Sequence, residues 1–378
     1  MVQPSLQPPG GGNAVCAWML QALRDDYHVT LLTWTPVDLE RVNEYYGTSL
    51  EPRDFTALAP PKWIRSPIDA VPASLAMLKT AVLRRRSKQI ADGFDVLMAA
   101  QDETDFGRPG IQFIHFPFRN LEALPANLRP YHRGSTLWIY ARMWSLVAPF
   151  DDRSMRSNLT LVNSAWTADV VAHAHGIPAR VVYPPAPGTF ETIPWADREN
   201  GFLCVGRLSP EKRIEDVIEI VRRVRAERPD AHLHIVGADS HPAYAARVRE
   251  MARRAGEWVT MEGSRSLPEM AGMLSRHRYL LHGMRQEHFG ITIAQALRAG
   301  CLPFVRDDGG QVEIPGDEPL LRYRSIDDAV EKILRVMSER ALQDDLAARL
   351  AARAERFSPD RFMAEIRAAV ESSSSLRS

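Results

Sequence analysis

The chain has 378 residues, of which 45% are hydrophobic and 25% charged, and its 47 basic residues balance its 47 acidic ones. This length exceeds what one hydrophobic core usually serves, so we expect two domains, and zero net charge gives no global attraction to nucleic acid. The three widely spaced cysteines indicate reduced, buried thiols in a cytosolic protein and argue against a disulfide framework or a zinc site. No apolar run reaches 18 residues, so we expect neither a membrane-spanning helix nor a signal peptide.

The N-terminal region begins a pattern of alternating strands and helices. Residues 1–6 are short for a strand, and a glycine run, Gly10, Gly11 and Gly12, leads into a predicted helix over 14–23 and a strand over 29–34. The order resembles a dinucleotide-binding unit, but the full GxGxxG spacing and its following acid are missing. The glycines therefore serve either the close approach of a ligand to the backbone or only a tight turn.

Two segments of the first half can each be interpreted in two ways. The predicted helix over 75–92 carries a basic face, which lies either on an anionic membrane or in solvent. Residues 137–150 are rich in aromatic side chains and form either a core helix or an apolar acceptor-binding surface.

Further strands are predicted over 94–98, 111–114, 159–164 and 181–183. His115 directly follows one of them, and ligands of open α/β sheets bind beyond the carboxyl ends of strands. His115 is therefore either a ligand-site residue or a structural histidine. We expect a first domain over 1–186 and a polar, proline-containing linker over 187–200.

The second half repeats the alternation. Strands are predicted over 201–206, 232–237, 258–260, 279–281 and 302–305, and helices over 214–226, 242–254, 267–274, 291–299, 326–336 and 341–356. Strands that alternate with helices indicate a parallel sheet, so the predicted fold class is α/β with two Rossmann-like, doubly wound domains facing a cleft. We expect the second domain over 201–358, and over 359–378 a helix that packs back on the first domain, followed by a disordered serine-rich tail.

Charged residues follow two strands of the second half. Arg207 and Lys212 share one turn, and two such cations suit a diphosphate, although isolated surface charge is the alternative. Glu287 stands in a loop just before a helix that opens after Gly290, where bare amides and the helix dipole favour an anion. An acid beside an anion site suggests that a neutral, hydroxyl-rich group such as a sugar is attached to the anion.

These residues carry a resemblance. Gly206-Arg207 with Glu211-Lys212, Glu287-x-Phe289-Gly290, Asn163-Ser164 and Tyr183-Pro184-Pro185 are similar to motifs of the family 4 glycosyltransferases, which are retaining enzymes of the two-Rossmann (GT-B) fold. Glu287 to Ile291 and His115-Phe116-Pro117 are most similar to the α-mannosyltransferase branch that extends lipid-linked oligosaccharides in asparagine-linked glycan synthesis. The resemblance covers nearly the whole chain and is most specific in the second half.

The resemblance implies a role for each matching position. It places the donor diphosphate on Arg207 and Lys212 and on the amides near Phe289, Gly290 and Ile291. It assigns Glu287 to the sugar hydroxyls and His115 to the sugar pocket near the reacting carbon. Gly11 and Gly12 would approach the donor or the acceptor.

One position departs from the family pattern. Gln295 replaces a second glutamate that contacts the nucleotide ribose in the family. Side chains of a helix tilt toward its N-terminus, so we expect Gln295 still to lean toward the donor. An amide lacks the charge of the carboxylate, and charge-assisted hydrogen bonds contribute roughly 1.5–3 kcal/mol against about 1 kcal/mol for neutral ones. We therefore expect weaker donor affinity or an altered nucleotide preference.

The resemblance implies transfer of a hexose, with mannose the sugar of the most similar branch, from a GDP- or UDP-sugar to a hydroxyl of a glycan, lipid-linked or small-molecule acceptor. The sequence shows no clear carboxylate pair for a glycosidase-like double displacement. The resemblance implies front-face transfer with retention instead, in which the leaving phosphate helps to take the acceptor proton. We expect no metal and no cofactor, no nucleic-acid partner, and a cytoplasmic protein with peripheral contact to the inner membrane face. The alternatives are a sugar-nucleotide epimerase, a phosphorylase, for which no cofactor lysine is identified, and a non-catalytic nucleotide-sugar-binding protein.

Overall fold

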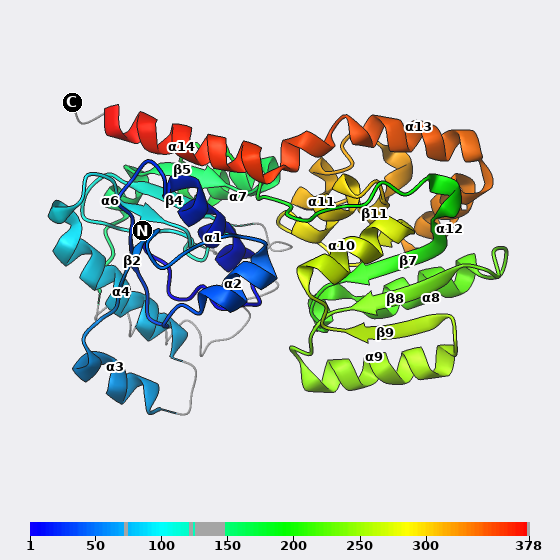
Figure 1. Cartoon of the computed structure of the whole chain (residues 1–378), viewed down its shortest axis with the longest axis horizontal. Coiled ribbons are helices and arrows are strands. Elements are labelled where there is room, and N and C mark those ends of the chain that lie inside the picture. Colours follow the sequence, from blue (N-terminus) through cyan, green and yellow to red (C-terminus); the bar gives the residue numbers. More distant parts are fainter. Residues whose placement is uncertain (72–74, 121–123, 125–147, 376–378) are drawn as a thin grey trace. The chain divides into compact units, whose positions relative to one another are not determined.

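A computed structural model describes residues 1–71, 75–120, 124 and 148–375 (Figure 1). The chain forms two compact units, the first made of Met1–Tyr183 with Asp360–Ser378 and the second of Pro184–Pro359. The segment 187–200, expected to be a linker, is instead part of the second unit, because its last residues begin strand β7 (Glu199–Val205) and pair with the sheet there.

The first unit contains a parallel sheet. Strands β3 (Met98–Ala99), β4 (Ile111–Ile114), β5 (Leu159–Val162) and β6 (Arg180–Val181) pair in chain order, and β1 (Thr30–Leu32) pairs with β2 (Thr56–Leu58). Val2 forms parallel bridges with both Leu32 and Ala99. The N-terminal segment, short for a strand in the sequence, therefore joins the two sets of strands through one bridging residue.

One core of the first unit is shared by helices from the two ends of the chain. Helix α1 (Gly11–Leu23) buries Val15 and Met19 in the same apolar cluster that holds Phe362 and Ile366 of α14 (Pro359–Ser375). The serine-rich end that we expected to be disordered is helical as far as Ser375. Serine is tolerated at a helix end because its hydroxyl can bond back to the backbone, as Ser372 does at 2.9 Å to the carbonyl of Ala369.

The remaining helices of the first unit are α2 (Leu39–Tyr46), α3 (Lys62–Asp69), α4 (Ala76–Ile90), α6 (Asp152–Arg156) and α7 (Ala165–His175). Helix α4 corresponds to the predicted basic helix. The aromatic segment 137–150 lies outside the described residues except for its last three positions. Its interpretation as core or acceptor surface stays a prediction.

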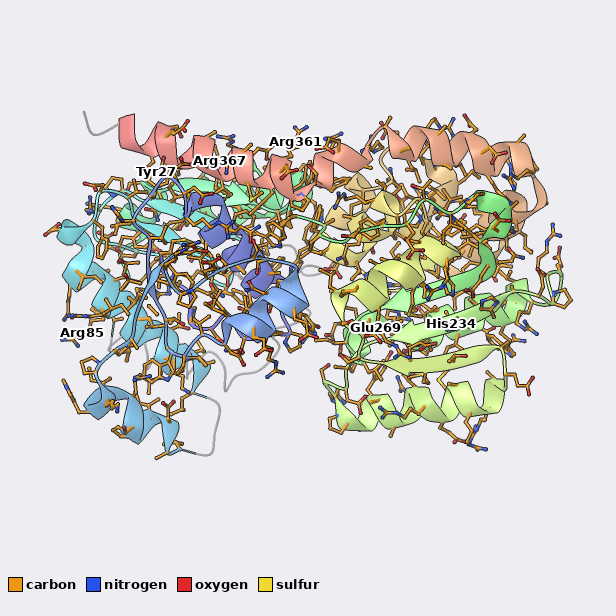
Figure 2. All side chains as sticks on the ribbon, in the orientation of Figure 1. Tyr27, Arg85, His234, Glu269, Arg361 and Arg367 are labelled. Atoms are coloured by element: carbon orange, nitrogen blue, oxygen red, sulfur yellow. The ribbon has the colours of Figure 1, made fainter. Side chains whose placement is uncertain are left out.

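Several cations of α4 make contacts within the first unit. Lys79 pairs with Asp69 of α3 at 2.7 Å, and Lys88 pairs with the buried carboxylate of Asp105. The Arg84 guanidinium lies 4.7 Å from the ring centre of Phe150. Arg85, labelled in Figure 2, remains exposed. The basic face is therefore smaller than the sequence indicated.

The second unit is built on one six-stranded parallel sheet. Its strands follow the order β12 (Arg322–Tyr323), β11 (Leu302–Arg306), β10 (His277–Leu281), β7, β8 (His232–Val236) and β9 (Val259–Gly263). This is the doubly wound order of a Rossmann domain, with its reversal between β7 and β10. The predicted strands of this half are confirmed.

The helices of the second unit follow the apolar pattern of the sequence. They are α8 (Ile214–Val224), α9 (Pro242–Ala255), α10 (Leu267–Arg276), α11 (Ile291–Arg298), α12 (Ile326–Ser338) and α13 (Arg340–Ala351). All five apolar positions predicted to form the inner face of α8 are buried: Ile214, Val217, Ile218, Val221 and Val224. Across the described part of the chain, none of the helices has both the length and the apolar character needed to traverse a bilayer.

Candidate functional site

The candidate site lies where the strand order of the second unit reverses. Strand β7 ends at Val205 and leads into the turn that carries Arg207 and Lys212. The neighbouring strand β10 ends at Leu281 and leads into the loop that carries Glu287. Open α/β sheets bind ligands beyond the carboxyl ends of strands at such a reversal. The topology therefore brings together two loops that lie 75 positions apart in the sequence.

Lys212 and Glu287 are in direct contact. The Lys212 Nζ donates to Oε2 of Glu287 at 2.6 Å, and their side chains are 17% and 15% exposed. His282 approaches the same oxygen with its Nε2 at 3.3 Å. Among the described residues no hydrogen bond reaches the second oxygen of Glu287, so that oxygen keeps its capacity to accept from a hydroxyl.

This contact sets the charge states of the site. Burial by itself would raise the pKa of Glu287, but the Lys212 ammonium and the hydrogen bond with His282 hold that pKa well below its ordinary value. Burial lowers the pKa of His282, and the nearby Lys212 lowers it further. Burial also lowers the pKa of His288 to about 4. At neutral pH the site thus holds an ionised carboxylate, an ammonium and two neutral imidazoles.

Gly290 positions the start of helix α11. Its φ of 97° lies in the left-handed region, and an added Cβ would come within 2.5 Å of the Ile293 side chain. No side chain caps this helix end, and its first turn contains no acidic residue. The first amides of a helix have no partner within the helix. The Ile291 end of the helix is therefore an open anion-binding position beside Lys212 and Glu287.

Three contacts hold the loop before α11 in place. The Phe289 side chain is 3% exposed and packs against Phe357, with ring centres 5.8 Å apart. The Glu287 carbonyl accepts from the Gly310 amide at 2.8 Å, and the Gln286 amide donates to Asp308 at 2.8 Å. Phe289 therefore anchors the loop with its ring, which leaves only its backbone for the predicted donor contact.

Arg207 occupies the outer side of the same turn. Its side chain is 56% exposed and lies 3.5 Å from Glu211, whose carboxylate also accepts from Ser209 at 2.6 Å. A half-exposed ion pair of this kind contributes at most about 1 kcal/mol. Arg207 can therefore exchange Glu211 for a more strongly charged phosphate.

Gln295 has a contact that the sequence did not indicate. The side chain is 6% exposed, and its Nε2 donates to the Pro187 carbonyl at 2.8 Å. Arg298, one turn later, donates to the neighbouring Ala186 carbonyl. Helix α11 thus holds the segment that enters the second unit. The predicted contact of Gln295 with a ribose stays a prediction, and only the amide oxygen of Gln295 could make it.

The other predicted site residues, His115, Gly11 and Gly12, belong to the first unit. Gly12 and His115 lie against each other there, because a Cβ at Gly12 would be 3.2 Å from the His115 Nε2. The same Nε2 lies 3.0 Å from the carbonyl of Ala100. The structure thus brings together the glycine loop and the strand end that the sequence singled out separately.

Asp102, which accepts hydrogen bonds from the backbone of His115 and Phe116, was not identified as a site residue from the sequence. Burial, and then the charge of Glu103, raise the pKa of Asp102 well above its ordinary value, although the backbone amides of His115 and Phe116 donate to its carboxyl group. Its backbone φ of 49° is unusual for a residue other than glycine. The signal in the sequence was an acidic run, Asp102 to Asp105, that directly follows an apolar strand.

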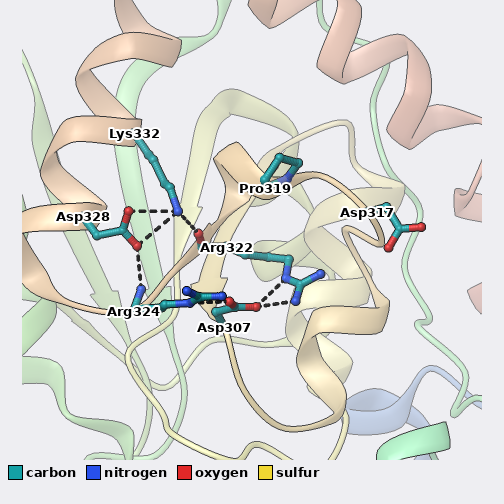
Figure 3. Close-up of a pocket in the computed structure, with 7 residues that line it drawn as sticks. All are labelled: Asp307, Asp317, Pro319, Arg322, Arg324, Asp328 and Lys332. Carbon is teal, nitrogen blue, oxygen red and sulfur yellow. Dashed lines mark hydrogen bonds and ion pairs between the residues drawn. The ribbon is translucent and has the colours of Figure 1, made fainter.

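A separate hollow of about 610 Å³ lies on the second unit (Figure 3). It contains none of the predicted site residues. Asp307 accepts from Arg324 at 2.8 Å, and Lys332 pairs with Asp328 at 2.9 Å, as Figure 3 shows. Asp307 also pairs with Arg322. These charges compensate one another, so the hollow has the character of a surface network of ion pairs.

We expected no metal, because no His/Asp cluster was apparent in the sequence. Among the described residues the structure nevertheless brings Glu199, His232, His234 and His277 together at the opposite ends of the strands, as a group that could hold a metal ion. His232 and His234 alternate along one strand, and this His-x-His spacing was the available signal. The other two residues, Glu199 and His277, come from β7, which lies next to β8 in the sheet order, and from β10, which lies next to β7.

Two doubly wound units, with a polar cluster at the strand reversal of the second, define a protein of the GT-B fold, as the sequence predicted. Residues 189–357 match the family described as glycosyl transferases group 1. The resemblance stated from the motifs is thereby confirmed.

Curated relatives point to one branch. The chain is 26% identical over 259 residues to the human GDP-Man:Man(3)GlcNAc(2)-PP-Dol alpha-1,2-mannosyltransferase, covering 62% of this chain and 51% of that protein. The protein of the same name from Neurospora crassa is 26% identical over 263 residues, covering 59% and 46%. The chain thus spans about half the length of the curated relatives that it matches.

Solved structures share the fold. Anabaena Alr3699/HepE in complex with UDP-glucose superposes with a TM-score of 0.67 at 16% identity, covering 98% of both chains. WaaG, a glycosyltransferase involved in lipopolysaccharide biosynthesis, gives 0.68 at 15% identity, covering 97% of this chain and 98% of that one. At sequence identities of 16% and 15%, this structural similarity shows a shared fold alone.

Proposed function

We propose that the chain is a retaining glycosyltransferase that moves a hexose from a nucleotide-diphosphate sugar to an acceptor hydroxyl. The observation that carries this proposal is the contact of Lys212 with Glu287 beside the uncapped start of α11, at the strand reversal. A cation and helix amides bind the diphosphate, and the free carboxylate oxygen of Glu287 accepts from hydroxyls of the attached sugar.

The same groups account for catalysis. As the bond to the sugar breaks, negative charge grows on the leaving diphosphate. Lys212, the α11 amides and, once it exchanges Glu211 for the phosphate, Arg207 stabilise this charge. The departing phosphate accepts the proton of the acceptor hydroxyl, and the sugar keeps its anomeric configuration. His115 lines the sugar side of the reaction within the first unit.

For the donor and acceptor we propose GDP-mannose and a lipid-linked oligosaccharide. The support is the name of the human and Neurospora crassa relatives, GDP-Man:Man(3)GlcNAc(2)-PP-Dol alpha-1,2-mannosyltransferase. UDP-sugars are the main competitor, because Alr3699/HepE was crystallised with UDP-glucose. Calorimetry with GDP-mannose and UDP-glucose separates the two donors.

The test of the function has two stages. Purified chain is titrated with GDP, UDP and their sugars, and nucleotide release is then measured with and without a lipid-linked acceptor. Transfer predicts release that depends on the acceptor, together with a product of retained configuration. An altered free sugar without any acceptor would instead indicate an epimerase, and binding of neither nucleotide would refute the proposal.

A non-catalytic sugar-nucleotide-binding protein is the second candidate. Gln295 favours it, because a neutral amide stands where the family has a glutamate and its nitrogen is engaged by Pro187. Saturable donor binding without turnover in any acceptor mixture would support this candidate over the transferase.

We also propose peripheral contact with a membrane through the pair of helices α3 and α4. Trp63 of α3 is 77% exposed, Val71 and Met77 are also exposed, and Arg85 is an exposed cation of α4. Apolar side chains beside cations favour an anionic lipid surface. Sedimentation with anionic and with neutral vesicles tests this. Trp63→Ser should weaken binding to anionic vesicles, and equal binding of both vesicle types would contradict the proposal.

A further inference from the structure

Four side chains meet at the amino-terminal edge of the sheet of the second unit. Glu199 opens β7, His232 and His234 lie on β8, and His277 opens β10, three strands that are neighbours in the sheet. One ligand atom from each lies within 4.8 Å of those of the others. We name these four residues the histidine–glutamate cluster. His234 is labelled on the second unit in Figure 2.

The histidines are held in the orientation that a metal ligand needs. His277 is 2% exposed, and its Nδ1 lies 2.9 Å from the Met273 carbonyl, so this nitrogen carries the proton. The His234 Nδ1 lies 2.6 Å from a carboxylate oxygen of Glu262. Backbone carbonyls and carboxylates fix metal-binding imidazoles in this way. In both rings the lone pair is thereby placed on Nε2.

The Nε2 of His277 has no hydrogen-bond partner among the described residues, although it is buried. Leaving a buried polar atom unpaired is unfavourable. Because the His277 Nδ1 is engaged by the Met273 carbonyl, its unpaired Nε2 is the nitrogen left to bind an ion. A neutral imidazole is the form that coordinates a metal ion.

The spacing of the cluster fits a small tetrahedral ion. Ligand bonds of about 2.1 Å place neighbouring ligand atoms of a tetrahedron about 3.4 Å apart. The Glu199 Oε2 lies 3.2 Å from the His232 Nε2 and 3.5 Å from the His277 Nε2. Both distances are close to the spacing that a tetrahedral ion requires.

Gly201 makes room for the cluster. It pairs with His232 across β7 and β8, and an added Cβ would come within 2.3 Å of the His232 Nε2. Glu199 and His232 are 42% and 29% exposed, so solvent reaches the cluster from their side. The site therefore has a protected inner ligand, His277, and an open outer side through which an ion enters.

We infer that the histidine–glutamate cluster binds one divalent transition-metal ion, with Zn²⁺ as the best match. Three imidazole nitrogens and one carboxylate oxygen are borderline ligands that suit Zn²⁺ and disfavour Ca²⁺ or Mg²⁺, which prefer oxygen alone. The ion would tie the first residues of three adjacent strands together and so stabilise the second unit.

The ion would take no part in sugar transfer. Glu199 is the first residue of β7, which spans seven residues, and Arg207 lies in the turn just beyond its other end. At about 3.3 Å per residue the strand separates the two sites by roughly 20 Å. Loss of the ion should therefore lower thermal stability and leave nucleotide affinity unchanged.

The test uses full-length, tag-free chain treated with a chelator, because a histidine tag would itself bind metal. Calorimetry with zinc chloride and absorption with Co²⁺ are the readouts. We expect one ion per chain, a tetrahedral Co²⁺ spectrum that Zn²⁺ abolishes, and a rise in Tm with zinc. Calcium should produce none of these changes.

The variants are chosen among the outer, exposed ligands so that folding is retained. Glu199→Gln with His232→Gln should weaken zinc binding at least about tenfold and abolish the rise in Tm. Gly201→Ala should weaken zinc binding without removing a ligand. His173→Gln, an exposed histidine of α7 in the first unit, is the matched control and should bind zinc as the parent does.

Two outcomes would overturn the inference. The first is no zinc binding by the parent chain at micromolar concentrations. The second is zinc binding that the double variant retains or that His173→Gln loses to the same extent. UDP and GDP affinity of the double variant should equal that of the parent, which separates this test from the proposed transferase function.

Discussion

Replacing Lys212 by methionine removes the ammonium while keeping a long, unbranched side chain. The diphosphate then loses one charge-assisted hydrogen bond. Such a bond contributes about 2 kcal/mol, which corresponds to roughly a 30-fold weaker affinity for UDP, GDP and their sugars. Calorimetry with free nucleotide and with nucleotide sugar measures both affinities.

The same replacement has a second effect on stability. Glu287, with a side chain only 15% exposed, loses its closest cation at 2.6 Å and stays ionised in a poorly solvated place. Removing one partner of a fully buried pair is destabilising by about 3–5 kcal/mol, and the partial exposure of this pair reduces the expected loss to about 2 kcal/mol. Urea denaturation measures this loss.

A double-mutant cycle separates the two effects. Lys212→Met with Glu287→Gln removes both charges, so stability should return to within about 1 kcal/mol of the parent while nucleotide affinity stays low. Glu287→Gln alone should keep the affinity for free UDP and GDP and weaken that for the sugar-bearing donors. Unchanged affinity of Lys212→Met for both free nucleotides would refute the assignment of the diphosphate to this turn.

Three further outcomes are expected. The sequence alone led us to expect that Gln295→Glu keeps or improves donor affinity. A carboxylate cannot donate to the Pro187 carbonyl, so this variant should also lose about 1–3 kcal/mol of unfolding free energy, measured in urea. Unchanged stability would contradict the role of this hydrogen bond. The pKa of His277 is lowered to about 4 in the folded chain, so between about pH 6.5 and 4 the imidazole binds a proton in the unfolded chain but not in the folded one. The unfolding free energy should therefore fall as the pH drops through this range, by up to about 1.4 kcal/mol per pH unit. His277→Gln should flatten this slope in denaturant titrations. Gly12→Ala should preserve Tm, because alanine favours a helix by about 1 kcal/mol, yet lower the transfer rate by displacing the His115 ring; an unchanged rate would argue against His115 at the sugar.

Periodicity determined much of the second unit. The apolar positions of α8 recur every three or four residues, and each of them is buried as that spacing requires. The loop from Glu287 to Gly290 was recognisable because a helix start after a strand is a local feature of the chain. Local patterns of this kind survive in any tertiary arrangement, which is why they could be read from the sequence.

The histidine–glutamate cluster was not recognisable in this way. His232 and His277 stand 45 positions apart, and only the order of the strands brings their rings to 5.8 Å. The role of Gln295 was missed for the same reason, because its partner Pro187 precedes it by 108 positions. Apart from the His-x-His spacing of His232 and His234, no local signal marks the cluster, and none marks the contact of Gln295.

The sequence by itself determined the alternating strands and helices, the start of helix α11 after Gly290 and the identity of the charged residues around it. Only the tertiary structure decided which of these charges pair, because hydrogen bonds between strands set the register and order that carry Lys212 to Glu287. The same sheet, through its opposite edge, assembled four metal-ligating side chains from three strands. The order of residues determines which side chains are present, whereas which of them lie close together depends on strand pairing, and strand pairing is a property of the whole sheet.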